Sequence, residues 1–289
     1  MLKLGFIGAG TVGTALAMRL SDRGYRVVAV SSRSQASAEK LAQSISGCQA
    51  VNSNQAVADL ADFVFITTPD GAIGPVASEV RWQPEQSVVH CSGSDSTAVL
   101  APARKSGAGV GAFHPLQTFA SVGQAMENIP GSTFAIEAEE PLLGTLKDMA
   151  IALKGSWIEL KAGDKVLYHA AAVIACNYLV TLVKLATDLW QTFNVPTGQA
   201  TRALMPLLRG TLNNIENVGI PGCLTGPIAR GDTGTIKKHI EALGKTAPAV
   251  LSTYRELGLQ TIPVALGKGR IDRHQAAELE TVLKGSDAQ

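Results

Sequence analysis

Apolar and polar residues alternate in short blocks along the first half of the chain. Apolar runs of strand length occupy residues 2–10, 25–33, 48–51, 62–70, 87–94 and 109–116, and helical stretches at residues 12–22, 34–45 and 53–61 separate the first four of them. Short buried strands that alternate with helices are typical of a doubly wound, mostly parallel α/β sheet. Two further runs, at residues 132–138 and 156–161, are predicted to extend the sheet.

The pattern changes near residue 160. Between Gly163 and Phe193 there is no proline or further glycine, and most residues are Ala, Leu, Val or Lys, which predicts one helix of about 30 residues. Shorter helices are predicted at residues 198–217, 232–243, 246–257 and 272–284. We therefore predict an α/β domain over residues 1–160 and an all-α second domain over residues 161–289, for substrate binding and dimerisation.

Composition narrows the class of protein. The 289 residues carry a net charge of +1, which argues against a nucleic-acid partner, and 46% of them are hydrophobic. No apolar run reaches the roughly 18 residues expected of a membrane span. The N-terminus lacks a signal-peptide pattern and the four cysteines form no CxxC pair, so we expect a cytoplasmic protein with free thiols.

The first strand runs into a glycine-rich turn with the sequence FIGAGTVG. In a GxGxxG turn between a strand and a helix, Gly8 permits the tight turn, Gly10 lets the backbone approach a pyrophosphate, and Gly13 permits close helix packing. The free N–H groups of the helix then face the phosphates. The turn predicts a dinucleotide-binding Rossmann domain, with contacts from Gly8, Ala9, Gly10, Thr11, Val12 and Gly13.

The end of the second strand indicates which dinucleotide binds. NAD enzymes usually place a carboxylate there, whereas this chain has Ser31, Ser32 and Arg33, which suit a 2′-phosphate. We therefore predict NADP (NADPH) as cofactor in preference to NAD. The fourth strand ends in Thr67, Thr68 and Pro69, and these residues are expected beside the nicotinamide-side ribose. For Asp70, a turn or capping role and a ligand contact both stay open.

Candidate substrate residues follow the fifth and sixth strands. Ser92 and Gly93 end the fifth strand and are expected beside the nicotinamide, whereas His90 and Cys91 are expected to be buried within the strand. His114 and Gln117 end the sixth strand at the same edge of the sheet, and His114 is a candidate catalytic residue.

The long helix carries a polar stripe on an otherwise apolar surface. Lys165 and His169 lie about 40° apart on it, and Asn177 lies at the edge of the same face. Hydride transfer requires a proton donor or acceptor beside the reacting group, and His169 or Lys165 could supply it. The alternative is a helix-end lysine and a hydrogen-bonded core histidine.

The segment CLTGPIARGD contributes the last candidates. Thr225 and Arg230 could hold an anionic group of the substrate, and Asp232 is expected to cap the next helix. The alternative is an ordinary helix–helix connection. The cysteines and histidines show no metal-ligand spacing beyond the adjacent His90 and Cys91, so we expect no metal site.

Five motifs carry a resemblance to a known family: FIGAGTVGTAL, HCSGS, FHPLQTF, YHAAAVIACNYL and LTGPIARGD. The chain resembles an uncharacterised bacterial family of Rossmann-like NADP-binding proteins with a helical C-terminal domain of unknown function, within the 6-phosphogluconate-dehydrogenase-like superfamily. Hydroxyacid dehydrogenases of that superfamily carry a helix lysine followed four residues later by Asn, or a lysine with a nearby His-Asn pair. Here His169 stands four residues after Lys165, and Ala170 occupies the place of the paired Asn, so their mechanism is not transferred. The proline synthesis of pyrroline-5-carboxylate reductases is not transferred either.

Together these features predict an NADP-dependent oxidoreductase for a small metabolite of carbonyl, imine or hydroxyacid type. The alternative is an NADP-binding regulatory or sensor protein without turnover. A homodimer is expected, because the long apolar helix carries more apolar surface than a small domain covers. No nucleic-acid or membrane partner is expected.

Overall fold

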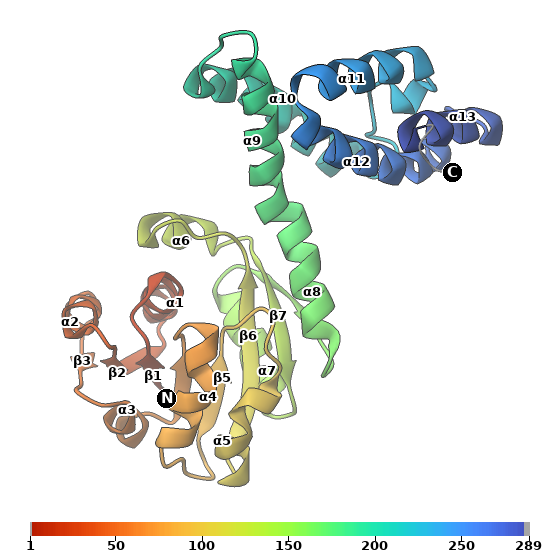
Figure 1. The fold of residues 1–289 in the computed structure, drawn as a ribbon. Helices are drawn as coiled ribbons and strands as arrows, with labels where there is room; N and C mark the ends of the chain where they lie inside the picture. Colours follow the sequence, from red (N-terminus) through yellow and green to blue (C-terminus); the bar gives the residue numbers. More distant parts are fainter. Residues whose placement is uncertain (1, 286–289) are drawn as a thin grey trace. The chain divides into compact units, whose positions relative to one another are not determined.

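The computed structural model describes residues 2–285, which divide into two compact units, Met1–Cys176 and Asn177–Gln289. The first unit is an α/β domain built on one eight-stranded sheet, with the strand order β3-β2-β1-β4-β5-β6-β7-β8 (Figure 1). The strands are β1 (Lys3–Ile7), β2 (Arg26–Ser31), β3 (Gln49–Ala50), β4 (Phe63–Ile66), β5 (Ser87–His90), β6 (Gly109–Leu116), β7 (Thr133–Ala138) and β8 (Ser156–Glu159). All neighbouring strands are parallel except β6 and β7, so the predicted doubly wound, mostly parallel sheet is confirmed.

Helices cover both faces of this sheet and enclose two apolar cores. One core lies under α1 (Thr11–Asp22), α2 (Gln35–Gln43), α6 (Val122–Asn128) and α7 (Leu142–Ala152). The other lies under α3 (Asn54–Leu60), α4 (Asp70–Glu79), the 3₁₀ turn η1 (Thr97–Leu100) and α5 (Ala101–Lys105). Because both faces are covered, the central strands are apolar on both sides, which is the origin of their continuous hydrophobic runs.

Aromatic side chains fill the first core. The rings of Phe6 and Phe65 stack at a centroid distance of 5.0 Å, and those of Phe113 and Phe134 stack at 4.4 Å. All four side chains are fully buried. Offset stacking of this kind adds about 0.5–1.5 kcal/mol per pair to the burial of the rings, so it fixes the strands that carry the site against one another.

The second unit is all-helical, as predicted. Its helices are α9 (Tyr178–Gln191), α10 (Thr197–Val218), α11 (Thr233–Thr246), α12 (Pro248–Gly267) and α13 (Arg273–Lys284), with the 3₁₀ turn η3 (Ile228–Arg230) before α11. The helices α11, α12 and α13 pack around buried Ile236, Ile262, Leu279 and Leu283. The helix α12 continues ten residues beyond its predicted end, through Gly258, where a Cβ would lie 2.6 Å from Leu283 Cδ2, and through Pro263.

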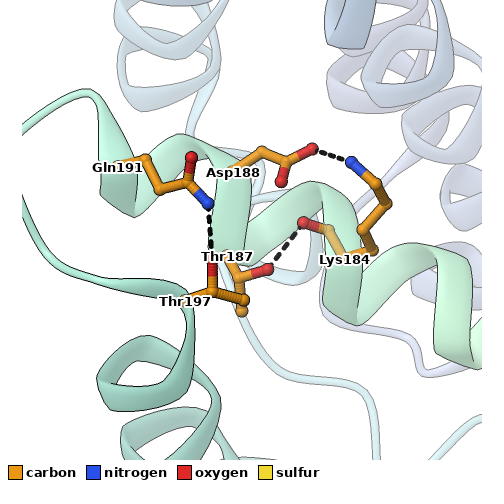
Figure 2. A network of polar contacts seen from close by, with 5 residues as sticks. All are labelled: Lys184, Thr187, Asp188, Gln191 and Thr197. Atoms are coloured by element: carbon orange, nitrogen blue, oxygen red, sulfur yellow. Dashed lines mark hydrogen bonds and ion pairs between the residues drawn. The ribbon is translucent and has the colours of Figure 1, made fainter.

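A polar network joins α9 to α10 (Figure 2). Gln191 Nε2 donates to Thr197 Oγ1 at 2.6 Å, which ties the end of one helix to the start of the next. Lys184 pairs with Asp188 one turn away, and Thr187 Oγ1 donates to the Lys184 carbonyl at 2.8 Å. These contacts satisfy the polar groups of an otherwise apolar helix.

The predicted long helix is present and contains a π-helical turn. Its apolar character also corrects one expectation from the sequence. The segment Asp164–Gln191 consists of α8 (Asp164–Ala172), a π-helical turn (Val173–Asn177) and α9. Among the described residues this segment is the one helix long and apolar enough to cross a membrane by length and composition. The expectation that no segment would pass this test is therefore wrong. Few residues between Val166 and Val183 are polar, so the apolar majority keeps the mean hydropathy at 1.8.

Candidate dinucleotide and substrate site

From β1 the chain builds the sheet outward through β2 to β3, and it then returns to place β4 on the other side of β1. The glycine-rich turn follows β1 and so lies at this reversal of strand order. The first and fourth strands are neighbours, so Gly8 and Thr67 lie side by side at their carboxyl ends. Gly8 N donates to the Ser31 carbonyl, and Thr67 N donates to the Ile7 carbonyl, both at 2.8 Å. In open α/β sheets this switch point is where ligands bind.

The three glycines of the turn differ in what a side chain at each position would meet. Gly8 has a φ of +115°, and a Cβ there would lie 2.8 Å from the Thr67 carbonyl carbon. A Cβ on Gly13 would lie 2.3 Å from Thr67 Oγ1 and 2.5 Å from the Gly8 carbonyl oxygen. A Cβ on Gly10 would meet nothing within 4 Å. The fold itself therefore requires Gly8 and Gly13, whereas Gly10 borders open space.

Unpaired polar groups remain after β1 and after β4. Gly10 is the N-cap of α1 and has no side chain to cap the free N–H groups of the first turn, so an anion fits this helix N-terminus. The hydroxyl of Thr68 is buried and has no hydrogen-bond partner within residues 2–285. The Thr67 hydroxyl, in contrast, donates to the Gly8 carbonyl at 2.8 Å and so holds the turn.

The end of β2 presents a cation and no carboxylate. Arg33 is exposed and forms no ion pair within the described chain. Ser32 is partly exposed and its hydroxyl accepts from Ser34 N at 3.3 Å, while Ser34 caps α2. The Ser31 hydroxyl is buried and donates to Asn54 Oδ1 at 2.6 Å. Arg33 and Ser32 are thus available to a phosphate, whereas Ser31 supports the strand end.

A second cation borders the glycine turn. A cavity of about 470 Å³ lies between α1 and α2, and its lining includes Gly10, Thr11, Ser37 and Lys40. Sequence reasoning missed Lys40. The spacing of Ser37, Lys40 and Ser44 along one face of the helix is the signal that could have found it.

A second group of residues meets at the ends of β5 and β6. We call Ser92, Gly93, His114, Lys165, Tyr168 and His169 the Gly93 cluster. Lys165 Nζ donates to the Ser92 carbonyl at 2.6 Å, and His114 Nδ1 lies 2.8 Å from the Tyr168 hydroxyl. A Cβ on Gly93 would lie 2.5 Å from His169 Cδ2 and 3.0 Å from His114 Nε2. Both histidine rings therefore reach the Gly93 backbone, and only glycine leaves room for them.

The Lys165 ammonium group is the buried charge of this cluster, with 1% of the residue exposed. Burial lowers its pKa, and the nearby carboxylate of Glu137 opposes this shift. Glu137 lies on β7, where its Oε1 accepts from Thr97 Oγ1 at 2.7 Å and from Thr97 N at 3.2 Å. Sequence reasoning missed Glu137, although a lone carboxylate in the apolar run STFAIEA was a signal.

Burial sets the protonation of the aromatic side chains in the cluster. Burial, together with the Lys165 charge and His169, lowers the pKa of His114 to about 4, so this ring is neutral at pH 7. Burial raises the pKa of Tyr168 to about 12, so its hydroxyl keeps its proton. Sequence reasoning missed Tyr168, which lies three residues after Lys165 and therefore on the same helix face.

His90 is an interior strand residue, as expected, whereas Cys91 follows the end of β5 and is only partly buried. His90 is fully buried, and its Nδ1 accepts from Ser92 N at 3.1 Å. Burial and the Lys165 charge lower the pKa of His90 to about 3, and burial raises that of Cys91 to about 12. Asp70 starts α4 and its carboxylate accepts from Ser94 Oγ at 3.4 Å.

The structure does not bring every predicted site residue into the Gly93 cluster. Gln117 follows β6 as an exposed residue, and its side-chain oxygen accepts from Thr118 N at 2.9 Å. Asn177, Thr225 and Arg230 belong to the second unit. Asp232 caps α11 as predicted, accepting from Thr235 N at 2.9 Å.

Two family models match the chain. Residues 3–93 match the family described as NADP oxidoreductase, coenzyme F420-dependent, and residues 132–261 match a domain of unknown function, DUF2520. The chain joins an NADP oxidoreductase Rossmann domain to a DUF2520 domain. The resemblance expected from the five sequence motifs is thereby confirmed. No curated protein matches the chain.

Solved structures share this architecture. A protein of Thermotoga maritima is 26% identical with a TM-score of 0.75, over 93% of this chain and 100% of that one. A protein of Bacteroides fragilis named as a candidate NADP oxidoreductase is also 26% identical, with a TM-score of 0.71, over 91% and 98%. A reductive aminase of Aspergillus terreus, in complex with NADPH and ethyl levulinate, is 17% identical with a TM-score of 0.65, over 97% and 99%. At that identity the likeness shows the fold alone.

The different roles of Gly10 and Gly13 give a matched pair of variants. Gly13→Ala should destabilise the protein by about 1–3 kcal/mol, because the new methyl group overpacks the turn. Gly10→Ala should cost no more than about 1 kcal/mol, the usual penalty for alanine at an N-cap. Gly10→Ala should nevertheless weaken NADPH binding at least about tenfold, since a methyl group there meets only the ligand. Calorimetric unfolding and NADPH fluorescence titration measure the two effects. Wild-type NADPH affinity in Gly10→Ala would contradict the assignment of the turn.

The low pKa of His114 can be tested by titration. Histidine NMR signals of the wild type, assigned with a His114→Asn variant, should show no His114 protonation between pH 7.5 and pH 5. Because its folded pKa lies below the usual value near 6.5, His114 makes the fold lose stability as pH falls from about 6.5 to about 4. The variant should lose less stability over that range. A His114 midpoint near pH 6.5 would mean that the ring is solvated.

Proposed function

We propose that the protein is an NADP-dependent oxidoreductase that acts by hydride transfer on a small metabolite of carbonyl, imine or hydroxyacid type. The observation that carries the proposal is the Gly93 cluster. It joins a buried lysine, a neutral histidine and a protonated tyrosine at the same sheet edge as the glycine-rich turn. Perturbed ionisable groups gathered beside a ligand-binding edge are typical of catalytic sites.

The chain supplies candidate contacts for the pyrophosphate and for the 2′-phosphate of NADPH. The N-terminus of α1 and Gly10 would hold the pyrophosphate, and Ser32 with Arg33 would hold the 2′-phosphate. Lys40 adds positive charge beside the turn. Bound NADPH supplies the hydride, so the protein must bind the acceptor and manage one proton.

The Tyr168–His114 pair is suited to manage that proton. Tyr168 holds a proton on its hydroxyl oxygen at neutral pH, and the neutral His114 ring can donate through Nδ1 to that oxygen. In this tautomer the phenolic proton is free to pass to a substrate oxygen or nitrogen, and the imidazole then stabilises the phenolate. His169, on the other side of Gly93, is the second candidate for proton transfer.

The solved relatives support the class of reaction. The Aspergillus terreus enzyme is a reductive aminase, and a fold neighbour from Streptococcus pyogenes is a 1-pyrroline-5-carboxylate reductase, 16% identical with a TM-score of 0.62. Both names describe reduction at a carbon–nitrogen bond. Carbonyl and imine compounds are therefore the first substrates to test.

Turnover decides between this proposal and the sensor alternative. A panel of carbonyl compounds with and without amines, and of cyclic imines, would be incubated with NADPH, and hydroxyacids with NADP⁺; the NADPH absorbance falls in the first case and rises in the second. We expect turnover with at least one class, and Tyr168→Phe should lower kcat by roughly 10²-fold or more, the usual contribution of a general acid. NADPH affinity should stay within about twofold, because the phenol does not bind the cofactor phosphates.

The matched control is Tyr178→Phe, which removes a hydroxyl from an exposed tyrosine of α9. It should leave kcat unchanged. If His169→Asn lost turnover and Tyr168→Phe kept it, the proton donor would be His169 and not Tyr168. Tight NADPH binding with no turnover on any substrate class would favour the regulatory or sensor protein.

We further propose that the protein is a homodimer through the apolar surface of α9 and α10. Val180, Leu207, Leu212 and Val218 are each more than half exposed. So much apolar surface is typical of an interface, and a second copy offers the same surface. Light scattering should give the mass of two chains without detergent, and Val180→Asp with Leu207→Asp should give one. Leu257→Asp, on α12, is the control; a monomeric wild type, or one recovered with membranes, would contradict the proposal.

A further inference from the structure

The second unit contains a cavity with three cations in its wall. Its volume is about 380 Å³, and its lining includes Thr225, Gly226, Arg230, Lys268 and Arg270. We call it the Arg230 cavity. No Asp or Glu side chain is among its lining residues. The volume is that of a small-metabolite site.

A fixed loop builds one wall of this cavity. Gly226 has a φ of +97° and Gly231 one of +69°, and the 3₁₀ turn η3 lies between them. Ala229 of that turn is buried. Lys268 Nζ donates to the Leu224 carbonyl at 2.6 Å, which fastens the loop to the end of α12. The wall is therefore held by defined contacts within the unit.

The cations of the cavity form no ion pair with the described residues of the protein, although the Thr235 hydrogen bonds, helped by the Arg230 charge, lower the pKa of the Asp232 carboxyl. None of Arg230, Lys268 and Arg270 forms an ion pair within residues 2–285. Asp232 is close in sequence, but its carboxylate is engaged as the cap of α11 by Thr235 N and Thr235 Oγ1. Like charges that share a concave surface repel one another and focus a positive potential.

Only one of the three cations has a structural role within the fold that explains its position at the cavity. Lys268 lies at the C-terminus of α12, where the helix dipole favours positive charge. Arg230 and Arg270 are both exposed, and no hydrogen bond from either side chain lies within the described part of the chain. Two guanidinium groups are thus free to turn toward a ligand.

The backbone adds further donors. The N–H groups of Thr225 and Gly226 make no hydrogen bond within residues 2–285, and both residues line the cavity. Guanidinium groups bind the paired oxygens of carboxylates and phosphates in a bidentate manner, and free N–H groups of a tight turn complete such sites. Their combination is selective for an oxyanion over a neutral ligand.

We propose that the Arg230 cavity binds the carboxylate or phosphate group of a small acidic metabolite. Arg230 and Arg270 bind the oxyanion directly, Lys268 holds the loop and adds charge, and the Thr225 and Gly226 N–H groups complete the site. The site lies entirely within the second unit and does not depend on the proposed reaction at the Gly93 cluster.

The test is a calorimetric titration of the full-length protein with sodium phosphate and, separately, with sodium malonate. Chloride is used to keep the ionic strength constant, and saturating NADPH fills the phosphate sites of the first unit. We expect binding of at least one anion, and Arg230→Gln or Arg270→Gln should weaken it about tenfold or more, the usual loss for a charge-assisted pair. Phosphate and malonate distinguish the two chemical sources of the anion.

Three controls make the result specific. Arg273→Gln removes an exposed cation from α13 of the same unit, outside the cavity, and should leave anion binding unchanged. Arg33→Gln removes the cation expected at the cofactor and should also leave it unchanged. Arg230→Gln should leave NADPH affinity as in the wild type, so failure of cofactor binding and failure of this site are distinguishable. Absence of binding for both anions, or equal losses in Arg273→Gln and Arg230→Gln, would overturn the proposal.

Discussion

The hydrogen bond from Lys165 to the Ser92 carbonyl is the contact on which the candidate substrate site depends. A buried ammonium group is costly by several kcal/mol unless polar groups surround it, and here a carbonyl at 2.6 Å and the Glu137 charge compensate it. The carbonyl is itself fixed, because Ser92 Oγ accepts from Asp95 N at 3.0 Å. Together with the His114–Tyr168 hydrogen bond, this contact places the first turns of α8 against the ends of β5 and β6.

The same charge determines the chemistry of its neighbours. Lys165 helps to hold His90 and His114 in their neutral forms, since a second positive charge nearby would be unfavourable in a buried site. Neutral imidazoles can accept or donate a hydrogen bond according to tautomer, whereas imidazolium can only donate. The cluster therefore combines one fixed cation with groups that can pass a proton. This arrangement suits a reaction in which negative charge develops on a substrate oxygen or nitrogen.

Local signals made the sheet, the glycine turn and several caps predictable from sequence. Gly8 and Gly13 reflect steric requirements within one turn, and Ser34 and Asp232 cap helices through residues three positions later. Tyr168 and Glu137 were missed because their roles depend on partners 54 and 40 residues away in the chain. The antiparallel β7 is likewise a matter of long-range pairing, which the apolar run STFAIEA does not reveal. Sequence periodicity predicted the helices and strands. The Gly93 cluster arises from the way they pack together, which periodicity does not show.

The family boundaries divide the proposed chemistry in an informative way. The segment matched to NADP oxidoreductases, residues 3–93, carries the glycine turn, Arg33 and Gly93. The DUF2520 segment, residues 132–261, begins with β7 and so includes Glu137, Lys165, Tyr168 and His169. The cofactor side thus lies in the segment matched to NADP oxidoreductases. Tyr168 and His169 lie in the segment of unknown function, and His114 lies between the two matched segments. Burial of Lys165 beside Ser92 costs stability, and the proposed hydride transfer gives that cost a functional reason.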